Sequence, residues 1–148
     1  MKFMEIAIEE ALKAKNNNEV PVGAVLVHRS GKIISKAHNL TESSHDPTSH
    51  AEIVVIRSAS EKLKTNRLVD YDLFVTMEPC LMCAGAISNA RIRRLYFGAY
   101  SSKRNDMVAF QLNQYFLSDE SNHSPEIYGG ILEIECSKLI KSYFKTKR

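Results

Sequence analysis

Two short fragments, His50-Ala51-Glu52 and Pro79-Cys80-Leu81-Met82-Cys83, constrain this chain more than any other feature. One histidine and two closely spaced cysteines are ligands that zinc prefers, and three protein ligands leave the fourth tetrahedral position for water. The chain must therefore fold so that two segments well apart in the sequence meet at one point. The pattern predicts a hydrolytic zinc site with His50, Cys80 and Cys83 as its ligands.

Both fragments are expected to open helices, each directly after a loop or a strand. Ser49 can cap the first helix, and Pro79 has the backbone angle suited to the first position of the second. Cys80 and Cys83 would then share one helical face, where the positive end of the helix favours the thiolate that binds metal. Glu52 is expected not to be a ligand but to shuttle protons between a zinc-activated water and a leaving group.

Each piece of this site has a simpler interpretation. Ser49 and Glu52 also match a capping box, and an isolated Cys-x-x-Cys can be a redox pair. A structural zinc would need a fourth ligand, for which His45 and Cys136 are the remaining candidates. The joint occurrence of all the pieces favours the catalytic site.

Length and composition are those of an ordinary globular protein. The 148 residues are enough for one domain, 1–148, with its own hydrophobic core. The net charge of +3 is too small to indicate nucleic-acid binding by itself. Three cysteines do not form an even disulfide set, and neither a membrane-length apolar run nor a signal-peptide pattern is found. A cytoplasmic enzyme with no membrane association is therefore expected.

Helices and strands are expected to alternate along the chain. The expected helices are 2–15, 50–64, 79–90 and 131–147, and the expected strands are 22–28, 33–37, 72–76, 94–98 and 127–130. The turn Arg29-Ser30-Gly31-Lys32 joins the first two strands into a β-hairpin. Strands that alternate with helices after this hairpin predict an α/β sandwich with a mixed sheet.

The combination H-x-E followed by P-C-x-x-C is the signature of the zinc-dependent nucleobase deaminases. A longer set of segments resembles the bacterial tRNA-specific adenosine deaminases within that superfamily. These segments are residues 19–27, 39, 45–53, 78–86, 91–99, 122–123, 130–132, 135–136 and 143–144. The resemblance covers nearly the whole chain.

The resemblance implies a three-layer α/β/α fold, like that of cytidine deaminases, with a mixed five-stranded sheet. It also implies hydrolytic deamination of adenosine to inosine at the wobble position of a tRNA anticodon, with Zn²⁺ as cofactor and Glu52 as the proton shuttle. Members of the family are homodimers that bind the anticodon stem-loop across the subunit boundary. The residues implied to contact the substrate are Asn39, Ala51, Pro79, Lys103 and His123.

One segment departs from the pattern of the family. The family usually carries an acidic residue at the position of Ser101 and a small, glycine-containing run after it, whereas Arg104-Asn105-Asp106-Met107-Val108 stands here. The alternative function is therefore a metabolic deaminase of a free nucleobase, guanine or cytosine, which needs no RNA surface. A binding protein with an inactive site is the third interpretation, and the presence of Glu52 and all three ligands argues against it.

Basic residues gather in two parts of the sequence. The first group is Lys138, Lys141, Lys145, Lys147 and Arg148, and the second is Arg91, Arg93, Arg94, Lys103 and Arg104. Tyr143 and Phe144 interleave with the first group, and basic residues with aromatic neighbours can contact phosphates and stack on unpaired bases. The alternative for the first group is a solvated helix face with its aromatic side chains packed inward.

Overall fold

The computed structural model describes residues 1–101 and 107–147, with side chains for residues 1–101 and 112–147. A five-stranded sheet of order β2-β1-β3-β4-β5 forms its centre. The strands are β1 (Gly23–His28), β2 (Ile33–His38), β3 (Tyr71–Met77), β4 (Arg94–Ala99) and β5 (Glu126–Tyr128). β1 runs antiparallel to both β2 and β3, whereas β3, β4 and β5 are parallel to one another. The prediction of a mixed sheet is confirmed.

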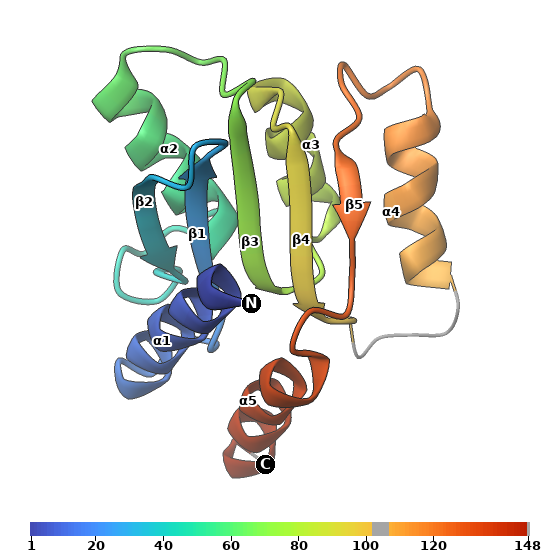
Figure 1. Cartoon of the computed structure of the whole chain (residues 1–148). Helices are drawn as coiled ribbons and strands as arrows, with labels where there is room; N and C mark the ends of the chain where they lie inside the picture. Colours follow the sequence, from blue (N-terminus) through green and yellow to red (C-terminus); the bar gives the residue numbers. More distant parts are fainter. Residues whose placement is uncertain (102–106, 148) are drawn as a thin grey trace.

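Helices cover both faces of the sheet (Figure 1). In the described residues they are α1 (Lys2–Asn16), α2 (Ala51–Leu63), α3 (Leu81–Ala90), α4 (Met107–Leu117) and α5 (Glu133–Thr146). α1 and α5 lie on one face, and α2, α3 and α4 lie on the other. The three-layer α/β/α fold is therefore confirmed. None of these helices combines the length and the apolar character needed to cross a membrane.

Two glycines bring the helices of the first face close to the sheet. A Cβ atom at Gly23 would overlap with the backbone of Ala7 in α1, and one at Gly98 would overlap with the Cys136 side chain in α5. A glycine at each position lets helix and strand approach more closely than a side chain would permit. Because Gly23 opens β1, this contact also locates the segment just before it, which leads into the pocket described below.

The starts of α2 and α3 differ from the sequence expectation. His50 rather than Ser49 is the N-cap of α2, because the Ser49 hydroxyl instead donates a hydrogen bond to Asp46 Oδ2 at 3.0 Å. Cys80 is the N-cap of α3, with extended backbone angles, so Pro79 precedes the cap and is not the first helical residue. Both capping predictions, and with them the capping-box interpretation, are wrong. The first ligand of each fragment therefore lies at the junction of an extended segment and a helix.

Helix α4 was not expected from the sequence. It lies over α3, and its Leu112 and Phe116 side chains are buried in the same core as α2 and α3. The remaining elements agree with the expected ranges to within a few residues. α4 is relevant to function because it adds a wall to the pocket.

Candidate metal centre and active-site pocket

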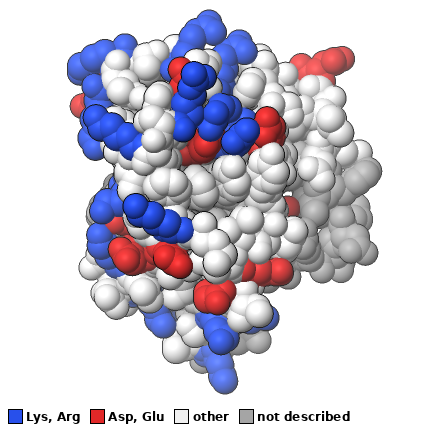
Figure 2. Space-filling model, in the orientation of Figure 1, with Lys and Arg blue, Asp and Glu red and all other residues white. Residues whose placement is uncertain are grey.

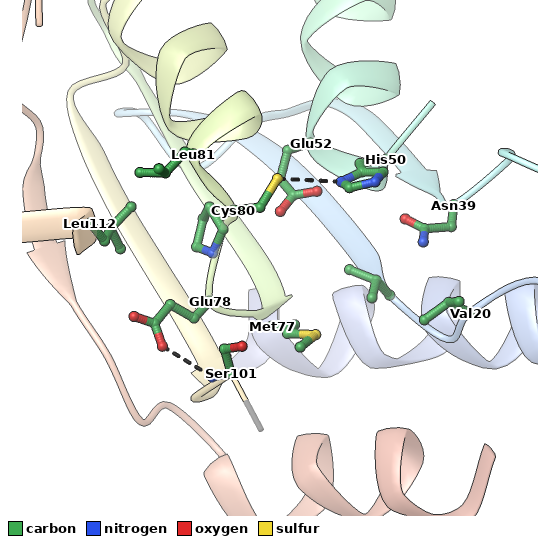
Figure 3. Close-up of a pocket in the computed structure, with 12 residues that line it drawn as sticks. Val20, Asn39, His50, Glu52, Met77, Glu78, Cys80, Leu81, Ser101 and Leu112 are labelled. Atoms are coloured by element: carbon green, nitrogen blue, oxygen red, sulfur yellow. Dashed lines mark hydrogen bonds between the residues drawn. The ribbon is translucent and has the colours of Figure 1, made fainter. Parts of the chain in front are cut away.

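A cavity of about 460 Å³ opens at the carboxyl ends of β3 and β4, where ligands commonly bind in open α/β sheets. Figure 3 shows the side chains that surround it. The polar lining consists of Asn39, His50, Glu52, Glu78, Cys80 and Ser101, and the apolar lining of Val20, Val22, Met77, Pro79, Leu81 and Leu112. A few polar groups within an apolar wall are typical of a site for a small planar ligand.

His50, Cys80 and Cys83 lie together at this pocket. The Nδ1 atom of His50 is 3.6 Å from Sγ of Cys80 and 3.5 Å from Sγ of Cys83, and all three ligand atoms lie within 4.8 Å of one another. Zinc–nitrogen and zinc–sulfur bonds of about 2.05 Å and about 2.3 Å at a tetrahedral angle give a separation of about 3.6 Å. Both nitrogen–sulfur distances therefore match those of a zinc site, and the three donors are of the kind that zinc prefers.

A fourth protein ligand is not found among the described residues. The cluster of potential metal ligands contains neither His45 nor Cys136. Cys136 is buried against Gly98 on the opposite face of the sheet, and His45 is exposed in the loop before α2. The arrangement therefore leaves one tetrahedral position for a water, as catalytic zinc sites do.

The two cysteines differ in their acidity before a metal binds. The pKa of Cys80 falls to about 4, chiefly because the Cys83 thiol donates a hydrogen bond to its sulfur, although burial opposes this shift. The pKa of Cys83 is raised, because it supplies the proton for that bond and because it is buried. The positive end of α3 further favours negative charge at its N-cap. One thiolate is thus present to receive a cation at neutral pH.

Glu52 lies beside the three candidate ligands and is not part of their cluster. Its side chain is only 4% exposed and lines the pocket from the first turn of α2. Burial raises the pKa of its carboxyl to about 7. A carboxyl group with this pKa can both accept and release a proton near neutral pH, as a general acid–base catalyst must.

Asn39 connects the end of β2 to the loop that leads to His50. Its side-chain Oδ1 accepts a hydrogen bond from the Ala51 N–H at 2.8 Å, and its backbone N–H donates to the Val22 carbonyl at 3.1 Å. These contacts fix the side-chain oxygen toward α2 and leave the amide nitrogen as the donor for a ligand. Ala51 is fully buried and is not among the residues that line the pocket, whereas Pro79 lines it.

Glu19 holds this loop in place and was not singled out by the sequence reasoning. Its fully buried carboxylate accepts hydrogen bonds from the Glu42 and Ser43 N–H groups at 3.0 and 2.8 Å. It also accepts bonds from the hydroxyls of Thr41 and Ser43. Asn39 and His50 lie at the two ends of the loop, so the carboxylate supports the geometry of both. The sequence signal for Glu19 was the polar, hydroxyl-rich loop, whose N–H and hydroxyl groups need a hydrogen-bond acceptor.

Glu78 and Ser101 form a hydrogen-bonded pair at the pocket that the sequence did not predict. The Ser101 N–H donates to Glu78 Oε2 at 3.0 Å (Figure 3). The Glu78 N–H donates to the Ala99 carbonyl at 2.8 Å. Glu78 is buried, with 5% of its surface exposed. The pair ties the end of β3 to the segment that follows β4. The position of Glu78 immediately before Pro79 was the only sequence signal for it.

His123, another expected substrate contact, is not among the described residues that line this pocket. His123 donates from Nε2 to the Ile92 carbonyl at 2.7 Å, and its N–H donates to Ser88 Oγ at 3.1 Å. Lys103 lies outside the described residues, as do residues 104–106 of the segment that departs from the family pattern.

Comparison with known proteins defines the class first. Residues 1–99 match the family model of the cytidine and deoxycytidylate deaminase zinc-binding region. This match covers most of the chain and includes His50, Cys80 and Cys83. The protein is therefore a zinc-dependent deaminase, with zinc as its cofactor.

Relatives with known activity narrow the class. The chain is 45% identical to the tRNA-specific adenosine deaminase of Agrobacterium fabrum over 146 residues, 99% of this chain and 94% of that protein. A solved structure from a study of A-to-I editing by tRNA:A34 deaminases is 46% identical, with a TM-score of 0.86, and the match covers 93% of this chain and 98% of that one. The chain belongs to the tRNA-specific adenosine deaminase family.

A free-base deaminase is a more distant neighbour. The guanine deaminase of Bacillus subtilis is 29% identical and superposes with a TM-score of 0.66, covering 97% of this chain and 92% of that one. Both values are lower than those for the tRNA deaminase structure. The comparison therefore favours the RNA-directed branch over the free-base alternative.

Proposed function

We propose that this protein hydrolyses adenosine to inosine at the wobble position of a tRNA anticodon. The observation that carries the proposal is the identity of 45% to 46% with tRNA adenosine deaminases, which extends over 93% to 99% of the chain. The pocket supports it, because a possible metal site and a buried carboxyl group lie together within it.

We propose that His50, Cys80 and Cys83 hold the zinc through Nδ1 and two thiolates. When bound, zinc would supply an activated water and leave room for it in the fourth position. The Glu52 carboxylate takes one proton from this water and passes it to adenine N1 as the water oxygen bonds to C6. Glu52 then takes the remaining hydroxyl proton and gives it to the exocyclic nitrogen as the C6–N bond breaks, so that water and adenosine become inosine and ammonia.

The proposed base contacts follow from the fixed orientation of Asn39. Its amide nitrogen would donate to a ring nitrogen of the purine, because its oxygen is occupied by the Ala51 N–H. The backbone around Ala51 and Pro79 would line the base. Lys103 and His123 stay predictions of RNA contact that rest on the family resemblance.

We further propose a homodimeric, cytoplasmic enzyme that consists of a single domain. Leu81 and Met82 support the dimer, because these apolar side chains are 50% and 39% exposed at the start of α3, beside the pocket. A subunit interface would cover such a pair. Light scattering of the purified protein tests the dimer, and a monomer at micromolar concentration would contradict it.

The direct test is an RNA-editing assay with a matched carboxylate control. Zinc-loaded protein is incubated with an anticodon stem-loop transcript that carries adenosine at the wobble position, and inosine is read by sequencing. We expect conversion by the wild type and by Glu61→Gln, an exposed carboxylate on α2, but not by Glu52→Gln. Elemental analysis should find equal zinc in all three proteins, because Glu52 is not expected to be a ligand.

Two outcomes would contradict the proposal. The first is an absence of inosine with the zinc-loaded wild type. The second is ammonia release from free guanine or cytosine at a higher rate than from the RNA, which would support the free-base alternative.

A further inference from the structure

Cationic side chains from separate segments gather at the sheet edge opposite the pocket. The segments are residues 28–32 after β1, 64–72 before β3, 90–94 before β4 and 122–126 before β5. Figure 2 shows lysine and arginine concentrated at the upper end of the molecule, where Figure 1 places these segments. The cationic members, called the basic edge below, are Arg29, Lys32, Lys64, Arg67, Arg91, Arg93 and Arg94.

Backbone hydrogen bonds hold the segments of the basic edge together. The Arg29 N–H donates to the Asp70 carbonyl at 2.8 Å, and the Arg93 N–H donates to the Tyr71 carbonyl at 2.9 Å. The Glu126 N–H in turn donates to the Arg93 carbonyl at 3.1 Å. Arg91, Arg93 and Arg94 belong to the second basic group that the sequence shows. The fold places cations from two other segments, residues 28–32 and 64–72, beside them.

Acidic side chains balance only part of this charge. The ion pairs are Arg29–Asp70 at 3.4 Å, Arg93–Asp72 at 2.7 Å and Arg94–Glu126 at 2.9 Å. Within the basic edge, four cations form no ion pair with any described acidic group. They are Lys32, Lys64, Arg67 and Arg91. Seven cations and three acids leave an excess larger than the net charge of +3 of the whole chain.

Helix ends explain two of these four cations. Lys64 and Arg91 are the C-caps of α2 and α3, where positive charge stabilises the helix dipole. Lys32 and Arg67 occupy no helix end, and both are exposed. Their charges repel the rest of the basic edge without a compensating partner in the described structure, which is the pattern of a surface that binds an anion.

The basic edge is too far from the pocket to contact the reacting base. β3 has seven residues from the basic edge to Met77 at the pocket, which corresponds to about 20 Å at about 3.3 Å per residue. A ligand that touches both sites must therefore be much larger than a nucleoside.

We propose that the basic edge binds the phosphate backbone of the tRNA outside the anticodon stem-loop. The inference rests on the proposed function, because it needs an RNA substrate. Five of the seven cations are arginines, whose guanidinium groups match phosphate oxygens with two parallel hydrogen bonds. The distance from the pocket assigns these contacts to RNA helices rather than to the loop that enters the active site.

Charge reversal at Lys32 and Arg67 tests the proposal. The double variant Lys32→Glu/Arg67→Glu is compared with Lys2→Glu/Lys36→Glu, which changes the same charge at exposed positions outside the basic edge. Zinc-loaded proteins are titrated with a full-length tRNA transcript and with a minimal anticodon hairpin at several salt concentrations. We expect the first variant to bind the full-length tRNA roughly tenfold more weakly, with a salt slope smaller by about 2. Binding and deamination of the minimal hairpin should not change.

Three outcomes would overturn the proposal. Unchanged affinity for the full-length tRNA excludes RNA contact at the basic edge, and an equal loss for both RNAs shows that the contact is not outside the anticodon stem-loop. Loss of binding to phosphatidylglycerol vesicles, with RNA binding intact, would assign the surface to a membrane. A wild type that fails to deaminate either RNA contradicts the proposed function instead, so the two failures are distinguishable.

Discussion

Replacement of Glu19 by alanine tests how the loop between Asn39 and His50 is held. The substitution removes the acceptor of hydrogen bonds from the Glu42 and Ser43 N–H groups and from two hydroxyls. Hydrogen bonds to a charged group contribute about 1.5–3 kcal/mol each. Water can replace part of this loss because the loop is exposed, so we expect the free energy of unfolding to fall by about 2–4 kcal/mol.

Thermal unfolding of the zinc-loaded protein measures this effect. For a chain of this length, that loss corresponds to a Tm lower by roughly 5–12 °C. Turnover of the anticodon stem-loop should fall as well, because Asn39 and His50 lie at the two ends of the loosened loop. The matched control is Glu42→Ala in the same loop, whose exposed side chain has no such role and whose loss should change Tm by less than about 2 °C.

The reasoning would be refuted by a Glu19→Ala protein with the Tm and turnover of the wild type. A Glu42→Ala protein that loses as much stability as Glu19→Ala would also refute it. In that case any acidic residue of the region, rather than the buried acceptor, would be responsible.

Further predictions concern packing, a buried hydroxyl and pH. Gly23→Ala should lower the free energy of unfolding by at least about 2 kcal/mol, because the new Cβ would overlap with the backbone of Ala7. Gly85→Ala has space for the added Cβ and should stabilise α3 by up to about 1 kcal/mol. Thermal melts that rank the two variants in the other order contradict this. Ser88→Ala should cost about 1–3 kcal/mol, with faster amide exchange at residues 121–123, because its Oγ accepts two of their N–H groups. Burial opposes ionisation of Glu19, but its hydrogen bonds outweigh burial and lower its pKa. The stabilisation is therefore complete above the ordinary value of 4.5 and is lost as pH falls through the lower folded pKa. The stability gap between wild type and Glu19→Gln should accordingly shrink as pH falls below 4.5 in urea titrations, and a constant gap would exclude this origin.

Local sequence patterns predicted most elements of the fold because each element satisfies its own pattern. The hairpin around Gly31 follows from a glycine turn between two strands, and its φ of +94° is a conformation that glycine adopts readily. The cap of α2 was mispredicted because a residue outside the local pattern binds the Ser49 hydroxyl. Asp46 takes the hydroxyl of Ser49, so the ligand His50 becomes the cap.

The cluster of three candidate metal ligands could be predicted because metal binding requires particular residue types at particular spacings. The pocket walls could not, because Leu112 belongs to a helix that packs on α3, and Glu78 acts through the backbone of Ser101. The basic edge was also beyond the sequence pattern. Lys32 and Arg67 are separate in the chain, and only strand pairing brings their segments to one edge.

The antiparallel pairing of β1 with β3 has a consequence for how the enzyme acquires its metal. As the chain leaves the ribosome, His50 emerges before β3, and the two thiols follow β3. The complete set of donors can thus exist only after β3 has docked against β1 in its correct register. A slip of one residue would displace the end of β3 by about 3.3 Å and turn its side chains to the other face, which separates Cys80 from His50. Retention of zinc by a newly made chain therefore reports that its longest-range strand pairing is correct.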